Sequence, residues 1–203
     1  FQYELCSILL NASEEKNDGQ ASADPSGDTN RSKNQFNSLG INITPTEKLK
    51  LNLGLMNTRN NYYFPNSLTK SQLISDPSQN GTGKEYTNDD YDIDDVSFQF
   101  DYQINSYLKI QGDYFKEEKS LFSQASYGNA LQDYDTENFN LVIPYSGENF
   151  SITYGVQLID SQRKDSSGLV TKDNKGYFVD TEIRMTDQLL LNAGTRFEKV
   201  DYT

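Results

Sequence analysis

Histidine is absent from this chain of 203 residues, and cysteine occurs once, as Cys6. Without histidine a zinc site or a histidine-based catalytic site is hard to build, and one cysteine cannot form an internal disulfide. The carboxylates are numerous, but no motif pairs them, and no glycine-rich phosphate loop follows a strand-like segment. We therefore expect no enzyme and no metal or other cofactor, and we interpret Cys6 as a small side chain in a strand.

Long apolar runs are missing too. No stretch of about 18 or more apolar residues occurs, so the sequence predicts no helix that spans a bilayer. Hydrophobic residues make up 34% of the chain, yet 14 tyrosines and 11 phenylalanines are present, and a disordered chain would lack such aromatics. The formal net charge of -12 argues against nucleic acid as a partner, because its phosphates would be repelled.

Apolar and polar residues alternate with a period of two in segment after segment, as in strands that have one apolar face. In the clearest segment the apolar residues are Val96, Phe98, Phe100, Tyr102 and Ile104, and polar residues stand between them. The same alternation covers residues 48–55, 108–114, 150–158 and 189–198, and a weaker form covers 1–10, 36–43, 139–143 and 177–185. The sequence therefore predicts about nine strands.

The connections between these segments alternate in length. Short connections rich in turn-forming residues lie at 44–47, 105–106, 144–149 and 186–188. Long polar stretches lie at 11–34, 60–93, 122–135 and 163–175. If the strands run up and down in sequence order, all long loops fall on one side and all short turns on the other, which is typical of outer-membrane barrels.

Strand length agrees with this interpretation, because about ten residues at roughly 3.3 Å each, tilted by about 40°, rise about 25 Å, the height of the apolar band of such barrels. We predict an all-β fold, a portion of an antiparallel transmembrane β-barrel. It has about nine up-and-down strands, short periplasmic turns and long extracellular loops. The sequence starts and stops within this pattern, and we expect it to be a fragment.

Charged residues recur at the polar positions of the alternation, and we expect these to face the barrel lumen. They are Asp101, Asp113, Asp180, Glu182, Arg184, Arg196 and Glu198. Two interpretations stay open: a structural lattice of ion pairs in a wet interior, and a direct role in substrate passage. The acidic run 89–95 lacks the spacing and glycine of a calcium loop, so we interpret it as the solvated base of a loop.

Aromatic residues gather near both ends of the predicted strands. Tyr62, Tyr63 and Phe64, at the root of a long loop, are candidate ligand-binding residues that would stack on a bulky ligand. The alternative is an anchoring role in the aromatic girdles at the membrane interfaces. Those girdles would also include Tyr177 and Phe178 on the long-loop side and Tyr107, Tyr145 and Phe150 on the short-turn side.

The last segment places Thr186-Asp187 at a turn and closes the following strand with Gly194-Thr195-Arg196-Phe197-Glu198. A Thr-Asp turn followed by a Gly-x-Arg-aromatic-acid strand end resembles the barrel of TonB-dependent outer-membrane receptors. The hairpin at 43–51 is similar to periplasmic turns of that family and of other outer-membrane barrels.

This resemblance implies a barrel of about 22 strands around an N-terminal plug, in the outer membrane of a Gram-negative bacterium. Residues 1–203 would be part of the barrel domain, with the plug and the remaining strands outside this sequence. The implied function is TonB-driven uptake of a scarce nutrient such as a ferric siderophore or a cobalamin-like compound. The implied partners are the lipid bilayer, lipopolysaccharide, TonB, the plug and the small-molecule ligand.

Two alternatives remain open. The first is another outer-membrane barrel, either a passive porin or a barrel that sheaths a partner protein, because turns, loops and alternation are common to all of these. The second is a soluble or surface-displayed β-protein such as an adhesin or a sugar-binding sandwich. Long, evenly apolar outward faces argue against the second alternative, because water would touch them.

Overall fold

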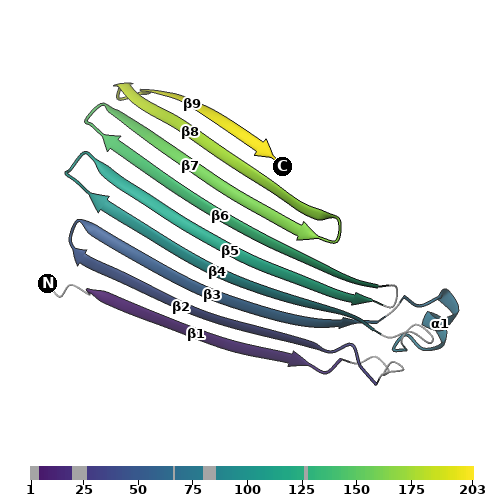
Figure 1. The fold of residues 1–203 in the computed structure, drawn as a ribbon. Helices are drawn as coiled ribbons and strands as arrows, with labels where there is room; N and C mark the ends of the chain where they lie inside the picture. Colours follow the sequence, from purple (N-terminus) through teal and green to yellow (C-terminus); the bar gives the residue numbers. More distant parts are fainter. Residues whose placement is uncertain (1–4, 20–26, 66, 80–85, 126–127) are drawn as a thin grey trace.

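The computed structural model describes residues 5–19, 27–65, 67–79, 86–125 and 128–203. Nine strands form one antiparallel sheet in sequence order (Figure 1). They are β1 (Cys6–Asn17), β2 (Ser32–Thr46), β3 (Leu49–Phe64), β4 (Thr87–Gln103), β5 (Lys109–Ala125), β6 (Gly128–Ser146), β7 (Phe150–Asp165), β8 (Gly168–Thr186) and β9 (Leu189–Tyr202). The predicted all-β, up-and-down fold of nine strands is confirmed. The sheet is open, because β1 pairs only with β2 and β9 only with β8.

The strands are longer than the alternation predicted, with 12 to 19 residues each. The predicted boundaries of the long loops were therefore wrong. In place of a loop at 163–175, β7 continues to Asp165 and β8 begins at Gly168. In place of a loop at 122–135, β5 continues to Ala125 and β6 begins at Gly128, and the connection 126–127 lies outside the described residues. Backbone pairing continues past the apolar positions because hairpin strands pair through main-chain groups, whatever side chains they carry.

The short turns lie together at one end of the sheet, and the long connections lie at the other end (Figure 1). The 18–31 and 65–86 connections are the longest, and the second contains the helix α1 (Lys70–Ser75). The Thr69 hydroxyl accepts a hydrogen bond from the Gln72 backbone, and the Gln72 side chain accepts one from the Thr69 N–H, which forms a capping box. None of the described helical structure is long and apolar enough to cross a membrane.

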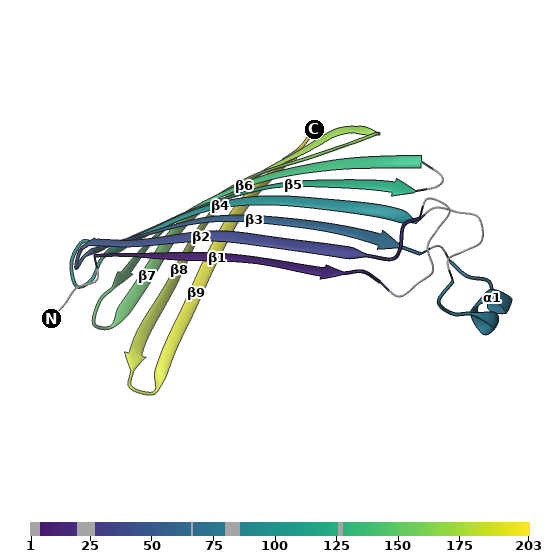
Figure 2. The ribbon, with the colours of Figure 1, turned by 90° about the horizontal axis from the view of Figure 1, so that it is seen from below.

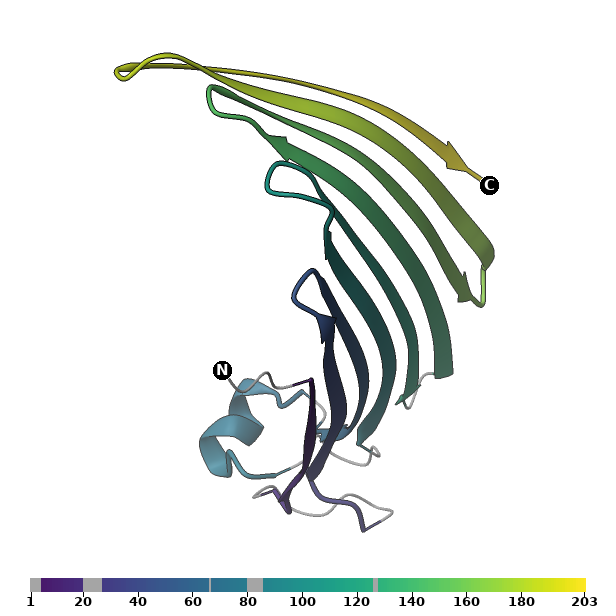
Figure 3. The same ribbon diagram turned by 90° about the vertical axis from the view of Figure 1, so that its left-hand side faces the viewer.

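The sheet is curved and twisted. All nine strands bend in the same direction (Figure 3), and β7 to β9 run at a clear angle to β1 to β4 (Figure 2). Exposure alternates along the strands: in β7 the side chains of Ile152 and Tyr154 are 38% and 45% exposed, whereas Gly155 is buried. Side chains on the inner side of a curved sheet converge and cover one another. The polar positions therefore form the concave face and the apolar positions form the convex face.

The described part of the chain has no globular core. Tyr86 is the only hydrophobic residue there that is buried, and no large side chain is fully buried. Large apolar side chains such as Leu53, Phe98 and Leu158 remain more than a third exposed on the convex face. A continuous apolar surface of this kind needs an apolar partner or solvent against it.

Candidate functional site

The apolar side chains of the convex face lie in rows that cross the strands in register. One row joins Leu51 on β3 to Phe100, then to Gly112, Leu141 and Val156. Gly112 has a packing role in this row, because a Cβ atom there would meet the Phe100 ring at 2.3 Å. We call this surface the apolar band. Its other members include Leu53, Leu55, Val96, Phe98, Tyr114, Phe139, Ile143, Ile152, Tyr154 and Leu158.

Aromatic side chains border the apolar band at its short-turn end. The ring centroids of Tyr107 and Tyr145 are 6.4 Å apart, and those of Tyr145 and Phe150 are 5.3 Å apart. These three residues form one cluster, as expected for a girdle on this side. At the other end the register places Tyr62 and Phe64 on the concave face, so they cannot belong to a girdle that faces outward. Tyr177 and Phe178 were predicted for the same girdle, but they lie in the middle of β8, and Phe178 is on the concave face.

The seven charged residues that the alternation predicted to face the lumen all lie on the concave face by register, in two separate groups. The first group is on β4 and β5. Lys109 forms an ion pair with Asp101, and Gln111 Nε2 donates a hydrogen bond of 3.1 Å to Asp101 Oδ2. Asn140 Nδ2 donates one of 2.8 Å to Asp113.

The second group is at the other side of the sheet, on β7 to β9. Arg196 donates a hydrogen bond of 2.7 Å to Gln157 and lies 3.6 Å from a carboxylate oxygen of Glu198. Asn174 Nδ2 also donates to Glu198. Asp180, Glu182 and Arg184 lie on the same face, but within the described residues their side chains form no ion pair. The structure therefore shows two polar networks and no single cluster of the seven residues.

Phe178 is a concave-face aromatic that the alternation did not single out as an inner residue. It lies across from Gly155, and a Cβ atom at Gly155 would meet its ring at 2.1 Å. The ring therefore packs over the glycine, in the way that aromatic residues cover strand glycines. The inward orientation of Phe178 could have been predicted from its position, because successive strand residues point to opposite faces and the preceding residue, Tyr177, is convex.

The register separates the three aromatic residues predicted to bind a ligand. Tyr62 and Phe64 share the concave face, and their rings are stacked with centroids 5.9 Å apart. Tyr91, which the sequence analysis assigned to a loop, joins them. Its ring lies edge-on to the ring of Tyr62, and the two ring centroids are 6.2 Å apart. Tyr63 lies on the convex face, where the Arg31 guanidinium lies 4.4 Å from its ring centroid. Successive strand residues point to opposite faces, so this separation was readable from the sequence once the strand extended this far.

Charged residues occupy the convex face between the apolar band and the long connections. Lys116 lies 2.7 Å from Glu118, 3.5 Å from Glu137 and 3.8 Å from Asp135. The run 89–95 contributes here as well, but alternation puts Asp90, Asp92 and Asp94 on this face and the other acidic members on the concave face. No described group of three or more histidine, cysteine or acidic residues is placed to hold a metal ion.

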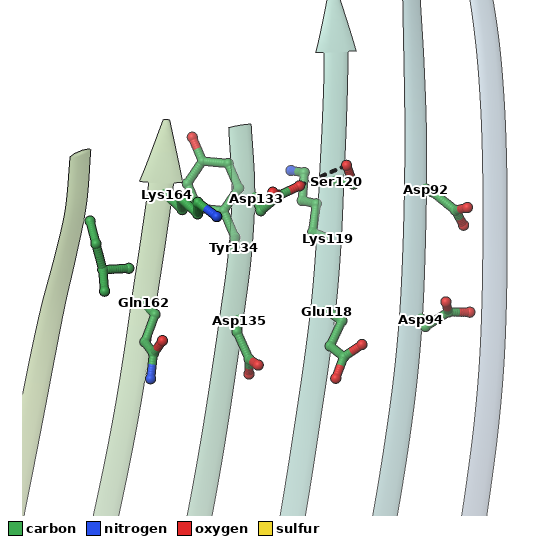
Figure 4. A pocket seen from close by; sticks show the side chains of 11 residues that line it. Asp92, Asp94, Glu118, Lys119, Ser120, Asp133, Tyr134, Asp135, Gln162 and Lys164 are labelled. Atoms are coloured by element: carbon green, nitrogen blue, oxygen red, sulfur yellow. Dashed lines mark hydrogen bonds between the residues drawn. The ribbon is translucent and has the colours of Figure 1, made fainter. Parts of the chain in front are cut away.

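A groove of about 380 Å³ lies within this charged region (Figure 4). Its lining residues are Asp92, Asp94, Glu118, Lys119, Ser120, Asp133, Tyr134, Asp135, Gln162, Lys164 and Leu169. Ser120 donates a hydrogen bond of 2.9 Å to Asp133 across β5 and β6. Sequence reasoning missed this groove because most of its residues fell in stretches expected to be loops.

In the described part of the long connection that carries α1, one carboxylate, that of Asp76, has a lowered pKa. The backbone N–H and the hydroxyl of Ser78 both donate to Asp76 Oδ1, at 2.9 and 2.6 Å. These two donors stabilise the ionised form and hold the pKa of Asp76 below its usual range.

No family model and no curated protein matches this sequence. Solved structures do match it along nearly its whole length. The ferric yersiniabactin uptake receptor FyuA from Yersinia pestis superimposes with a TM-score of 0.80 at 10% identity, over 99% of this chain and 35% of that one. The alcaligin outer-membrane receptor FauA from Bordetella pertussis gives 0.73 at 11%, over 98% and 32%. The copper transporter OprC gives 0.70 at 11%, over 99% and 34%.

The chain therefore has the fold of part of a TonB-dependent receptor barrel, and it spans about a third of the length of each of these proteins. This structural likeness extends over the whole described sheet, whereas the resemblance in sequence to the family was seen mainly in the segment 176–198. At about 10% identity the likeness concerns the fold, and the relatives' ligands stay properties of those proteins.

Proposed function

We propose that this chain forms part of the barrel wall of a TonB-dependent transporter in the outer membrane of a Gram-negative bacterium. The observation that carries the proposal is the apolar band, which lies exposed on the convex face of a sheet with the fold of such barrels. A lipid bilayer is the solvent in which this face is stable, because every second residue of a spanning strand then meets hydrocarbon. The polar concave face would line the lumen.

The proposed assembly needs more than residues 1–203, which are a part of the barrel domain. β1 and β9 each have a free edge, and in a membrane each edge must pair with another strand. A plug domain and further strands of the same protein, with TonB as the energy-coupling partner, complete the transporter. Lipid and lipopolysaccharide contact the convex face.

The proposed ligand is a bulky, scarce nutrient such as a ferric siderophore or a cobalamin-like compound. Tyr62 and Phe64 are its candidate contacts, because their stacked rings lie on the concave face near the long connections. Tyr63 has the interfacial role, since it lies on the opposite face against Arg31. For the two polar networks we favour the structural interpretation, because Asp101, Asp113, Arg196 and Glu198 each form a hydrogen bond with a residue of a neighbouring strand.

Growth and fractionation of cells that carry the full-length protein test this function. The protein should fractionate with outer membranes and migrate anomalously on gels unless it is boiled, because closed barrels resist detergent. It should support growth on scarce iron supplied as chelates, and this growth should stop in cells that lack the TonB system. Uptake that continues without TonB would favour the passive porin, and recovery as a detergent-free soluble monomer would exclude the membrane location.

Loop replacement provides a second test of the same function. Replacing residues 67–79, which include α1, with a short Gly-Ser linker leaves β3 and β4 intact. We expect uptake to weaken while the barrel still assembles, because the long connections lie at the proposed extracellular mouth. Replacing the short turn at 187–188 with another two-residue turn is the matched control, and it should leave uptake unchanged.

A further inference from the structure

Two adjacent concave-face rows near the long connections, which we call the mouth rows, contain carboxylates but no cationic side chain. The outer row consists of Asn17, Ser32, Tyr62, Asp89, Ser123 and Ala130, paired in register. The inner row consists of Glu15, Asn34, Asn60, Tyr91, Leu121 and Gln132. Among these described residues the only charged ones are Glu15 and Asp89, so these two rows carry negative charge, and the nearest concave-face cation, Lys119, lies in the next row away from the long connections.

Aromatic rings occupy the centre of the mouth rows. Tyr62 stacks with Phe64 and makes an edge contact with Tyr91, so the three rings form a continuous platform. Phe64 is 47% exposed, which leaves ring surface open at the end of the strand. The face of an aromatic ring carries partial negative charge, so it attracts cations and planar groups and disfavours anions.

Hydrogen-bond acceptors without donors flank this platform on both sides. Asp89 lies directly opposite Tyr62 on β4, and Asn34 lies diagonal to Tyr62 on β2. Oδ1 of each side chain is covered by protein atoms and accepts no hydrogen bond. An ionised carboxylate can only accept, so the Asp89 side chain attracts a ligand that brings an N–H or O–H donor or a positive charge and repels a negatively charged one.

We infer that the mouth rows select a ligand by charge, so that the transporter takes a ring-bearing chelate that is cationic or neutral and rejects polyanionic chelates. In the bound state a planar ring of the ligand stacks on Tyr62, and a donor or positive charge of the ligand meets Asp89. Glu15 adds to the repulsion of anions. This inference rests on the proposed transport function, since it assigns the kind of chelate that the proposed function takes.

Two iron chelates of similar shape and opposite charge test the inference. Tris(phenanthroline)iron(II) is a dication and tris(hydroxyquinolinesulfonato)iron(III) is a trianion, and each is an octahedral complex with three planar aromatic ligands. Binding of each is measured by equilibrium dialysis with the full-length protein in detergent, against protein-free micelles. We expect the dication to bind about tenfold more tightly or better, as a charge-assisted contact in a partly desolvated site predicts. Equal affinities, tighter binding of the trianion or no binding of either chelate would overturn the inference.

Variants of the mouth rows assign the preference to particular side chains. Asp89→Asn keeps the shape and should weaken binding of the dication about tenfold while leaving the trianion unchanged. Tyr62→Ala should weaken both chelates by about threefold or more through lost stacking. Tyr63→Ala is the matched control, because the neighbouring tyrosine lies on the convex face and should change neither. An unchanged preference in Asp89→Asn, or equal effects of the two tyrosine variants, would contradict the assignment.

A second variant keeps the test decisive if Asp89→Asn does not assemble. Ser123 is the cross-strand neighbour of Asp89, and Ser123→Lys places a cation beside the carboxylate. This variant should likewise remove the preference for the dication, and a preference that persists in it contradicts the inference. The transport function is tested separately by growth with and without TonB. A charge preference without TonB dependence would overturn the transport function alone, and TonB-dependent uptake without a charge preference would overturn the inference alone.

Discussion

Arginine substitutions at adjacent residues test whether the two faces of the sheet meet different solvents. Leu51 and Tyr154 lie near the middle of the apolar band on β3 and β7, and Tyr154 is 45% exposed on the convex face. Asn52 and Thr153 are their chain neighbours on the concave face. Arginine that faces lipid near the middle of the bilayer costs about 2–4 kcal/mol, whereas arginine in a wet lumen costs little. We therefore expect Leu51→Arg and Tyr154→Arg to destabilise the barrel by about that amount.

The two control positions on the concave face, Asn52 and Thr153, have polar surroundings in which an arginine is tolerated. Thr153 lies opposite Asp180, so an arginine at position 153 has a carboxylate within reach across the strands. Asn52 pairs with Asn42 on β2 and with Gln99 on β4, so both of its cross-strand neighbours are polar. We expect Asn52→Arg and Thr153→Arg to be nearly neutral.

The assay is urea unfolding of the full-length protein reconstituted in lipid, with all four variants compared at the same lipid composition. A shift of register by one residue exchanges the two faces, so the paired design also detects an inverted assignment. Equal costs within each pair would mean that the two faces meet the same solvent. That result would refute the transmembrane assignment of this sheet.

Three further predictions concern packing, surface charge and pH. Gly155→Ala should destabilise the barrel by about 1–3 kcal/mol, because the new Cβ meets the Phe178 ring, and a double-mutant cycle with Phe178→Ala should recover part of this cost. Lys116→Met leaves several carboxylates without their shared cation and should slightly lower the denaturant midpoint of unfolding at low salt, and lower it less at high salt. Ser78→Ala should raise the pKa of Asp76 toward its ordinary value in an NMR titration, because a donor to the carboxylate is lost. The lowered pKa of Asp76 stabilises its turn above the ordinary pKa, and this stabilisation is lost as pH falls through the lowered value.

The predicted strands near the apolar band were confirmed, and their ends were not. Val96, Phe98 and Phe100 alternate with polar residues, so the sequence showed both the strand and its apolar face. Residues 87–95 are acidic and look like a loop, yet they continue β4 in register with β3 and β5. Where both faces of a strand meet water, side chains no longer alternate in polarity, and the strand leaves no periodic signal.

The candidate ligand site also shows what sequence alone could not predict. Tyr62 and Phe64 were predicted as contacts, and strand geometry now puts them on one face with Tyr91, while Tyr63 lies on the other. Tyr91 is 29 residues away from Tyr62 along the chain, and only the pairing of β3 with β4 brings the two rings together. A sequence-based assignment of neighbours cannot find such a contact without the register.

The sequence by itself determined the fold class, the order of the strands and the identity of the apolar face, because a strand's side chains alternate with a period of two whatever the strand pairs with. Tertiary structure alone decided which residues meet across strands. The two polar networks, the packing of Phe178 over Gly155 and the acceptors beside Tyr62 all depend on register and curvature. Register and curvature are set by main-chain hydrogen bonds between distant segments, and the local sequence does not show which main-chain groups will pair.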